Sequence, residues 1–276
     1  GRFLFDFAKR NRPIVMGILN ATPDSFSDGG KFRSPKDAIA QAERMLADGV
    51  DLIDIGGEST RPGAEPVGLQ EELDRVLPVI EALKDCGVPL SIDTYKPETM
   101  RQALHAGVDC VNDIWALRQT GAVDAVLESQ NCGIVLMHMQ RDPLTMQFDP
   151  EYINVITEVK QFLKDRADLL ISSGIAIDRI AIDPGFGFGK SLEHNLNMLS
   201  NFSEFTTLGL PVLAGISRKS MIGKITGKDT NDRVAPSIAA AIMAADRGAS
   251  IVRVHDVAET VDALKLWEAI QVDMSI

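Results

Sequence analysis

Residues 250–256 read SIVRVHD, a pattern typical of one strand of a closed parallel sheet. Alternate side chains of a strand share a face, so Arg253 and His255 lie on one side and Val252 and Val254 on the other. The two valines are suited to packing against helices, which turns the arginine and the imidazole toward the interior. Because a buried arginine is costly unless it meets an anion, the pattern predicts an anion-binding site where this strand ends.

Seven other short apolar runs of the same kind precede this one. They are rich in Val, Ile and Leu, as expected for strands of a parallel sheet that is buried on both faces. The eight runs span 14–20, 50–57, 89–94, 109–114, 133–138, 179–184, 211–217 and 250–256. Amphipathic stretches that read as helices lie between them, among them 34–49, 69–87 and 256–270.

Eight strands that alternate with eight helical segments predict an α/β fold, a (β/α)8 TIM barrel. A doubly wound open sheet is the alternative, but eight parallel units in one uninterrupted chain favour closure. We expect residues 1–276 to form a single barrel domain, because no low-complexity linker divides them. Residues 2–6 and 12–15 are expected to pair as a small N-terminal hairpin at the barrel bottom.

Composition narrows the classes of partner. The net charge of −11 argues against a general nucleic-acid binder, which would need a basic face. The sequence has no apolar run of membrane-spanning length and no recognisable secretory signal, so we expect a cytoplasmic protein that does not contact membranes. The three cysteines lack metal-ligand spacing, and the four histidines are scattered without an H-x-H pair.

Polar residues end six of the eight strands, and in a barrel these ends meet at the mouth, where the chemistry of this fold takes place. The six are Asn20, Asp93, Asn112, His138, Asp183 and His255. Closure puts the last strand beside the first, which brings Arg253 and His255 close to Asn20. Thr60 and Arg61, in the loop after the second strand, belong to the same sector.

One sector therefore contains two guanidinium groups, an imidazole, an amide and a hydroxyl. This set predicts a binding site for a polyphosphate or a metal-phosphate group. The opposite sector holds Asp93, Asn112 and Asp183. Carboxylates and an amide in a low-dielectric pocket suit the N–H donors of a flat heterocycle. A purely structural hydrogen-bond network is the alternative interpretation of these three residues.

Two loops at the mouth carry further candidates. In SRKSMIG, residues 217–223, Ser217 is predicted to cap a helix whose first turn contains Lys219 and Ser220. Backbone N–H groups at such a helix start offer a carboxylate or phosphate site. The loop 21–35 is long against a typical 4–6 residues and exposes Phe26, so we expect a lid, with a disordered connector as the alternative.

Residues 184–191, PGFGFGKS, look like a Walker A phosphate loop but have Pro184 where that loop needs its first glycine. No Rossmann context accompanies the string. We interpret it as a tight turn over the pocket, in which Phe188 supplies an aromatic wall. Lys190 is then a surface or structural residue rather than a phosphate ligand.

Eight segments together resemble the dihydropteroate synthase family of folate biosynthesis, in family order, from about residue 12 to residue 265. The segments are MGILNATPDSFSDGG, DIGGESTRPGA, SIDTYKPE, NDI, LMHMQ, DPGFGFGK, ISRKSMIG and RVHD. The resemblance implies a transferase that condenses 6-hydroxymethyl-7,8-dihydropterin diphosphate with 4-aminobenzoate. It also implies a requirement for Mg²⁺, inhibition by sulfonamides and a homodimer.

The resemblance further implies roles for single residues. For the diphosphate these residues are Asn20, Thr60, Arg61, Arg253 and His255, with Asn20 also meeting Mg²⁺. For the pterin they are Asp93, Asn112, Met137, Asp183 and Lys219. For 4-aminobenzoate they are Pro62, Phe188, Lys219 and Ser220, with Phe26 closing the site. Asn20, Arg61, Asp93, Lys219, Arg253 and His255 form the catalytic set.

The chemistry implied is SN1-like, with departure of diphosphate before attack by the weakly nucleophilic arylamine, and it needs no side-chain nucleophile. A methyltetrahydrofolate methyltransferase shares the pterin barrel but has no diphosphate to hold, which Arg61, Arg253 and His255 argue against. An inactive pterin-binding paralogue is the other alternative. Such a protein is expected to lose Asn20, Lys219 or the RVH run, and all are present.

Overall fold

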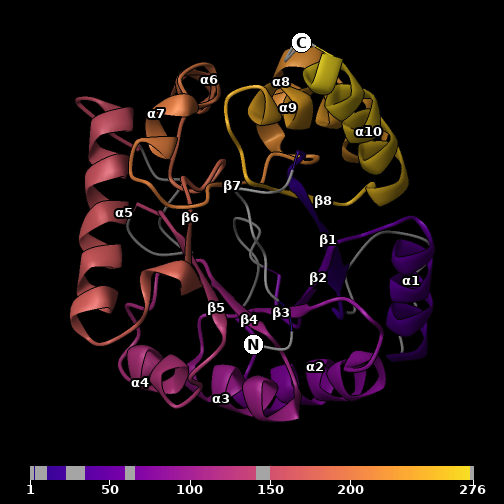
Figure 1. Cartoon of the computed structure of the whole chain (residues 1–276), viewed down its shortest axis with the longest axis vertical. Coiled ribbons are helices and arrows are strands. Elements are labelled where there is room, and N and C mark those ends of the chain that lie inside the picture. Colours follow the sequence, from indigo (N-terminus) through magenta and orange to yellow (C-terminus); the bar gives the residue numbers. More distant parts are fainter. Residues whose placement is uncertain (1–2, 4–10, 23–34, 60–65, 141–149, 274–276) are drawn as a thin grey trace.

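The computed structural model of the chain shows eight parallel strands in a ring, with helices around the outside (Figure 1). The structure describes residues 3, 11–22, 35–59, 66–140 and 150–273. The strands lie in the order β6-β5-β4-β3-β2-β1-β8-β7. A parallel bridge between Ile182 and Val212 joins the two ends of this order. The predicted TIM barrel is therefore confirmed, and the open sheet is wrong.

Each strand lies within one of the predicted runs. The strands are β1 (Ile14–Asn20), β2 (Leu52–Gly56), β3 (Leu90–Asp93), β4 (Cys110–Asp113), β5 (Gly133–Met137), β6 (Ile180–Asp183), β7 (Leu213–Ala214) and β8 (Ile251–Val254). The predicted run at 211–217 contains only the two residues of β7. Pro211 has no N–H to donate to a neighbouring strand, and beyond Ala214 the chain turns over the barrel mouth.

The helices cover the outer surface of the strands. They are α1 (Pro35–Ala47), α2 (Leu69–Leu83), α3 (Pro97–Ala106), α4 (Ala122–Leu127), α5 (Val155–Ser172), α6 (Leu192–Ser200), α7 (Ser203–Thr206), α8 (Ser220–Thr226), α9 (Val234–Ala245) and α10 (Val257–Asp273), with short 3-10 turns η2 (Ile177–Arg179) and η3 (Thr230–Asp232). The described residues thus contain short helices beyond the eight that the sequence predicted. None of the described helices is long and apolar enough to cross a membrane.

Inward-facing residues form layers inside the barrel, as alternation along each strand requires. The lowest layer is a separate apolar cluster: Ile14, Met16, Leu52, Val135, Ala181, Leu213 and Ile251. Two residues further along three of these strands, the inward residue is charged: Asp54 after Leu52, Asp183 after Ala181 and Arg253 after Ile251. The apolar floor therefore places the ionisable side chains at the C-terminal ends of the strands.

The N-terminal hairpin falls mainly outside the described residues, since 1–2 and 4–10 are not among them. Ile14 and Val15, from its second half, pair with β8 as part of β1. Just before them, the Arg12 guanidinium donates to Asp51 at 2.7 Å, and Asp51 also accepts from the Val15 N–H at 2.9 Å. This ion pair fixes the start of β1 at the lower end of the barrel.

Candidate active site

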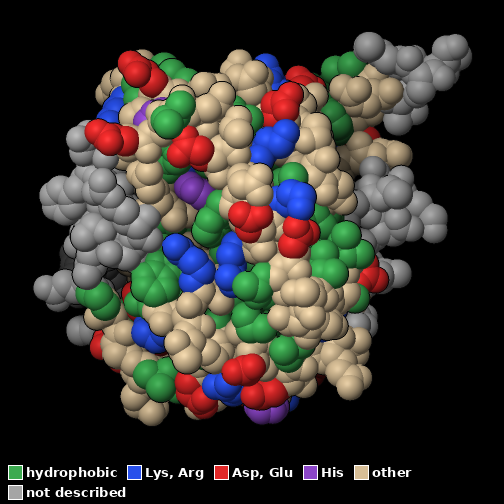
Figure 2. Space-filling view, turned by 90° about the vertical axis from the view of Figure 1, so that its left-hand side faces the viewer, with side chains coloured by type: hydrophobic (Ala, Val, Ile, Leu, Met, Phe, Trp, Pro, Cys, Tyr) green, Lys and Arg blue, Asp and Glu red, His purple; other side chains and the backbone are tan. Residues whose placement is uncertain are grey.

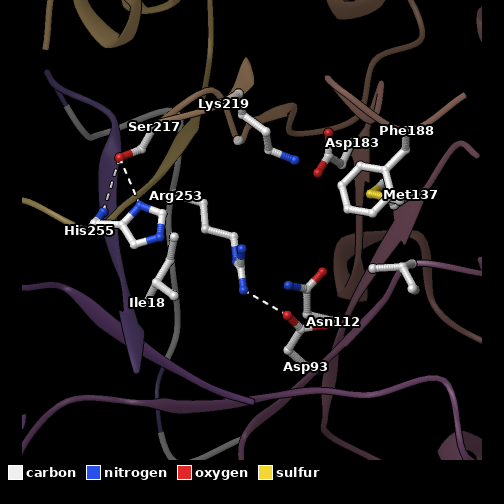
Figure 3. A pocket seen from close by; sticks show the side chains of 12 residues that line it. Ile18, Asp93, Asn112, Met137, Asp183, Phe188, Ser217, Lys219, Arg253 and His255 are labelled. Atoms are coloured by element: carbon white, nitrogen blue, oxygen red, sulfur yellow. Dashed lines mark hydrogen bonds and ion pairs between the residues drawn. The ribbon is translucent and has the colours of Figure 1, made fainter. Parts of the chain in front are cut away.

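A cavity opens among the C-terminal ends of the strands, and most of the predicted pterin and diphosphate residues surround it (Figure 3). Its lining residues are Ile18, Asp93, Asn112, Ile114, Met137, Asp183, Phe188, Gly215, Ser217, Lys219, Arg253 and His255. They come from seven strands or from the segments that follow them. The structure thus brings together residues that lie as much as 237 positions apart, from Ile18 to His255.

Arg253 lies at the centre of the polar part of this cavity. Its Nε donates to Asp54 Oδ2 at 2.7 Å, and its second nitrogen donates to Asp93 Oδ2, also at 2.7 Å. Asn112 Nδ2 donates to the same Asp54 oxygen at 3.0 Å. Arg253 therefore bridges the two sectors that the sequence predicted on opposite sides of the mouth.

Asp54 is a site residue to which the sequence analysis gave no role. Its side chain is fully buried and holds both Arg253 and Asn112 from below the cavity. Alternation contained the signal: Leu52 belongs to the inward apolar layer, so Asp54 must also face inward. A buried carboxylate is unfavourable without a cation beside it. Arg253 lies inward on β8 at the same height, two residues beyond the apolar layer, and so was the candidate partner.

Two carboxylates that line the cavity are shifted toward their neutral forms. Burial, opposed by Arg253 and reinforced by Asp54, raises the pKa of Asp93 to about 7. Burial also raises the pKa of Asp183, although the Gly185 N–H, which donates to its Oδ1 at 2.7 Å, acts in the opposite direction. Both groups therefore gain from a ligand that brings N–H donors or positive charge.

The cations respond to the same environment. Burial lowers the pKa of Lys219 to about 8, and the nearby Asp183 only partly opposes this. Burial also disfavours the charged form of Arg253, but Asp54 and Asp93 outweigh it and raise the Arg253 pKa. Arg253 consequently stays charged at all ordinary pH values. The protonation state of Lys219, in contrast, can change with the charge of a ligand that binds beside it.

Some polar atoms under the cavity have no partner among the described residues. They include Oδ1 of Asp93 and Oδ1 of Asp54. A buried carboxylate oxygen usually accepts a hydrogen bond, so an unpaired one in a cavity wall indicates where a ligand donor is missing. The deep end of the cavity is therefore built for a molecule with several N–H groups, which supports the heterocycle interpretation.

An aromatic and a methionine side chain complete the wall opposite Arg253. Phe188 and Met137 both line the cavity, and the Lys219 Nζ lies 4.0 Å from the centre of the Phe188 ring. The same ammonium donates to the Phe186 carbonyl at 2.8 Å. A flat ligand can therefore stack on apolar surface while its polar edge meets the carboxylates.

The SRKS turn differs from the prediction. Helix α8 begins at Ser220, and Lys219 rather than Ser217 occupies its N-cap position. The Ser217 hydroxyl instead contacts His255 Nδ1 at 3.0 Å and accepts from the His255 N–H at 3.2 Å. Arg218, between Ser217 and Lys219, has a φ of +56°. This left-handed turn directs the side chains of both neighbours to the cavity.

Contacts outside the cavity hold Arg218 in that conformation. Its guanidinium forms an ion pair with Asp256, and its N–H donates to the Ser237 hydroxyl at 2.9 Å. Arg233 donates to the Arg218 carbonyl at 3.0 Å. Every polar group of the strained residue's backbone is therefore used, and the turn is defined by helix α9 and the end of β8.

His138 does not belong to the ring of polar residues at the mouth, and this part of the prediction is wrong. Met137 faces inward, so the next side chain faces outward, where His138 packs edge-on against Phe162 of α5. Its Nδ1 lies 2.9 Å from the Lys190 ammonium. Lys190 is only 4% exposed, which makes it a structural residue, as one of the two predicted alternatives held.

The remaining predicted residues lie at the edge of the site or outside the described part. Asn20 ends β1 and is half-buried beside Gly56. Ser220 is exposed at the start of α8 and does not line the cavity. Thr60, Arg61, Pro62 and the lid residue Phe26 lie outside the described residues.

The donor set near Asn20 fits a metal held mainly by a substrate. In the described part of the chain, no group of three His, Cys, Asp or Glu side chains could hold an ion on its own. Mg²⁺ is commonly bound through one or two protein oxygens together with substrate phosphates. The Asn20 amide oxygen, near the mouth, provides a ligand of that kind.

Side chains of both charges are distributed over the face of the molecule drawn in Figure 2. No broad basic surface appears on that face, in agreement with the net charge of −11. The arginine and lysine that line the cavity are instead surrounded by carboxylates. These features favour a small-molecule ligand.

Comparisons with known proteins point to one family. Residues 16–255 match the family model described as pterin binding enzyme. The chain is 49% identical to the dihydropteroate synthase of Haemophilus influenzae over 260 residues, which are 93% of this chain and 94% of that protein. It also resembles the crystal structure of Burkholderia cenocepacia dihydropteroate synthase complexed with 7,8-dihydropteroate, with a TM-score of 0.87, 52% identity and coverage of 96% and 93% of the two chains. The dihydropteroate synthase of Xanthomonas albilineans with 4-aminobenzoic acid gives a TM-score of 0.89 at 52% identity, with 94% and 93% covered.

The raised pKa of Asp93 predicts a particular pH dependence of stability. The folded protein keeps this proton up to a pH of about 7, whereas the unfolded chain releases it near the ordinary aspartate pKa of 3.8. Between these values the folded state binds more protons, so the free energy of unfolding should fall as pH rises, by at most about 1.4 kcal/mol per pH unit for one group. The Asn side chain of Asp93→Asn does not titrate in this range, so this variant lacks the pH-dependent contribution.

Urea unfolding of both proteins between pH 4.5 and pH 8 measures the effect. We expect Asp93→Asn to gain stability relative to the wild type as pH rises to 7, with no further gain above it. Asp178→Asn, which changes an exposed aspartate on η2, serves as the control and should follow the wild type. Parallel curves for Asp93→Asn and the wild type would show that Asp93 is ionised throughout.

Proposed function

The chain belongs to the dihydropteroate synthase family of pterin-binding enzymes, and on that premise we propose that it condenses 6-hydroxymethyl-7,8-dihydropterin diphosphate with 4-aminobenzoate. The products are 7,8-dihydropteroate and diphosphate. The observation that carries this proposal is the deep cavity with an unpaired Asp93 oxygen, an adjoining amide and a second carboxylate. These acceptors match the N–H-rich edge of a pterin.

The pterin is proposed to bind at the deep end of the cavity. Asp93 and Asp183 accept hydrogen bonds from its ring and amino N–H groups, and Asn112 supplies both a donor and an acceptor. Met137 packs on one face of the ring, and Lys219 contacts its edge. The support is geometric, since all five line one cavity and the two carboxylates gain from added N–H donors.

The aminobenzoate is proposed to lie against Phe188, near the mouth. Its ring stacks on the phenyl group, and its carboxylate lies close to Lys219 and Ser220 at the start of α8. The position of the Lys219 ammonium, 4.0 Å from the Phe188 ring centre, supports this arrangement. Pro62 and Phe26 are proposed to complete and close this part of the site.

The diphosphate is proposed to lie toward β1 and β8. Arg253 and His255 contact it from β8 and the residue after it, and Thr60 and Arg61 reach it from the loop that follows β2. Ser217 fixes the His255 ring by its contact with Nδ1. Because Arg253 also holds Asp54 and Asp93, the residue that neutralises the leaving group is the one that positions the pterin acceptor.

A divalent cation fits this site, and we propose that it is Mg²⁺, held by the Asn20 amide oxygen together with diphosphate oxygens. When bound, it supplies a Lewis acid that neutralises the charge of the departing diphosphate. The protein's own contribution is the fixed guanidinium of Arg253, preorganised by two carboxylates.

The bond that breaks joins the pterin methylene carbon to the bridging oxygen of the diphosphate, which leaves with the electron pair. The dihydropterin ring delocalises the positive charge of the methylene group, and Asp93 and Asp183 stabilise it electrostatically. The arylamine nitrogen then forms the new C–N bond and releases a proton. This SN1-like order requires no side-chain nucleophile.

Two alternatives are weaker. A methyltetrahydrofolate methyltransferase has no diphosphate to bind, so it offers no use for Arg61, Arg253 and His255 together. An inactive pterin-binding paralogue is expected to have lost Lys219 or the RVH run, whereas Lys219, Arg253 and His255 all line the cavity. Both alternatives predict pterin binding without formation of dihydropteroate.

We also propose that residues 1–276 form one cytoplasmic barrel domain. The single continuous sheet supports the domain assignment. Expression of the chain with a fluorescent tag tests its location: a uniform cytoplasmic signal is expected, and enrichment at the cell envelope would contradict the proposal.

Release of diphosphate from 6-hydroxymethyl-7,8-dihydropterin diphosphate, measured with Mg²⁺ and 4-aminobenzoate, tests the activity. We expect stoichiometric release of diphosphate and formation of 7,8-dihydropteroate, with loss of both after chelation of the metal. Pterin binding without product at saturating 4-aminobenzoate would favour the paralogue instead.

Arg253→Lys separates catalysis from binding. Lysine keeps a positive charge beside Asp54 and Asp93 but lacks the planar fork that matches phosphate oxygens. We expect kcat to fall by about 100-fold, the usual effect of removing one preorganised donor, while the Kd for the pterin substrate changes less than about threefold. Arg12→Lys is the matched control, because Arg12 also pairs with an aspartate but at the opposite end of the barrel. An unchanged kcat in Arg253→Lys would contradict the proposed diphosphate contact.

The chain is proposed to form a homodimer through helices α8 to α10. These neighbouring helices expose several apolar side chains: Ile225, Met243, Leu266 and Ile270. Leu266, at 67% exposed, is the most accessible of them, so Leu266→Glu should shift the protein from dimer to monomer in light scattering. Ile177→Glu, on η2 and also well exposed, should leave the dimer intact. A wild-type monomer would contradict the proposal.

A further inference from the structure

Lys190, at the end of the glycine-rich loop after β6, has an unusually complete set of contacts for a buried lysine. Its Nζ donates to the Gly185 carbonyl at 2.9 Å and to the Phe188 carbonyl at 3.0 Å, and it meets His138 Nδ1 at 2.9 Å. An ammonium group has three N–H donors, and three acceptors surround it at close range. The side chain is therefore saturated within the protein and has no donor left for a substrate.

The loop has to be wound tightly to bring its carbonyls to one ammonium. Gly185 has a φ of +74°, and a Cβ atom there would lie 2.0 Å from the His138 carbonyl oxygen. Gly189 has a φ of +63°, and its Cβ would lie 2.8 Å from that of Gln140. Glycine is required at both places because the loop turns back against the end of β5.

Other side chains bind further polar groups of the loop. The Tyr152 hydroxyl donates to the Gly189 carbonyl at 2.8 Å, and the Gly187 N–H donates to Asn195 at 2.7 Å. Lys219 donates to the Phe186 carbonyl from the cavity side at 2.8 Å. The loop therefore lies between two lysines, Lys190 behind it and Lys219 in front.

The residues that Lys190 holds are next to the walls of the active site. It binds the carbonyl of Phe188, whose ring lines the cavity and faces Lys219. It also binds His138, which directly follows the cavity residue Met137. One buried ammonium thus connects the two apolar walls from their outer side.

We propose that Lys190 is a positioning residue for the arylamine subsite, which it shapes by fixing Phe188 relative to the end of β5 without touching either substrate. This inference rests on the proposed function, which assigns 4-aminobenzoate to the Phe188 wall. It predicts a larger effect on the arylamine substrate than on the pterin, because Lys190 binds Phe188 directly but reaches Met137 only through the next residue, His138. The carboxylate partners of the pterin lie on β3 and β6.

The energetics agree with a specific role. Burial lowers the pKa of Lys190 to about 7, although Asp183 opposes this shift, so keeping the group charged inside the protein is unfavourable. A methionine of similar length would fill the same space without that penalty. The hydrogen bonds to Gly185, Phe188 and His138 are what methionine cannot provide.

Lys190→Met tests the proposal, with Tyr152→Phe as the matched control that removes a different hydrogen bond from the same loop. For Lys190→Met we expect the KM for 4-aminobenzoate to rise by about tenfold or more, because a buried hydrogen-bonded group is left unpaired. The KM for the pterin substrate should change less than about threefold. Tyr152→Phe should leave both constants within about twofold of the wild type.

An equal rise of both KM values in Lys190→Met, or the same rise of the aminobenzoate KM in the two variants, would show that Lys190 only stabilises the loop, and the proposal would fail. An unchanged aminobenzoate KM would also overturn it. If Lys190→Met does not fold, the same criteria apply to Lys190→Gln, whose amide keeps two donors.

Hydrogen exchange of residues 184–191 without substrate separates this proposal from the proposed function. We expect faster exchange in Lys190→Met than in the wild type, whether or not the wild type makes dihydropteroate. A wild type that makes no product contradicts the proposed function alone. Unchanged exchange in the variant contradicts the role of Lys190 alone.

Discussion

The buried contact of Arg253 with Asp54 and Asp93 is the interaction on which the rest of the site depends. Three carboxylates face the barrel interior above an apolar floor, and removing them from water is unfavourable without a cation beside them. Arg253 forms ion pairs with two of them at 2.7 Å, and these carboxylates raise the pKa of its guanidinium. Arg253 thereby links the carboxylates of β2 and β3 into one set of charges beside the cavity.

Around this core, two unusual turns place the side chains that the strands cannot supply. The left-handed backbone of Arg218 turns Ser217 toward His255 and Lys219 toward the cavity, while its own guanidinium is held by Asp256 outside. The glycine-rich loop after β6 folds over Lys190 and presents Phe188 to Lys219. The strands of the barrel thus carry the carboxylates, and a loop fixed by the buried Lys190 carries the aromatic side chain. Functional side chains on loops above a rigid barrel are usual in this fold.

Alternation along the strands was the most productive signal in the sequence, and its errors have physical causes. It placed Asp93, Asp183 and Arg253 inside the barrel, where the structure has them. His138 was assigned to the mouth because it ends a run, yet it follows the inward Met137 and so must face the helices. Asp54 lies near the end of the second strand and received no predicted role, because the same rule was not applied to that strand. Ser217 was interpreted as a helix cap from local sequence, whereas a tertiary partner, His255, takes its hydroxyl.

By itself the sequence determined the eight strands, the inward position of Asp93, Asp183 and Arg253, and membership of the family, because strand period and motif order are local properties of the chain. Only the tertiary structure decided which inward side chains meet. Asp54 and Arg253 are 199 residues apart and become partners through the register and closure of the barrel, which no local pattern encodes. The same holds for Lys190, whose acceptors are brought together only when the loop winds back onto the end of β5.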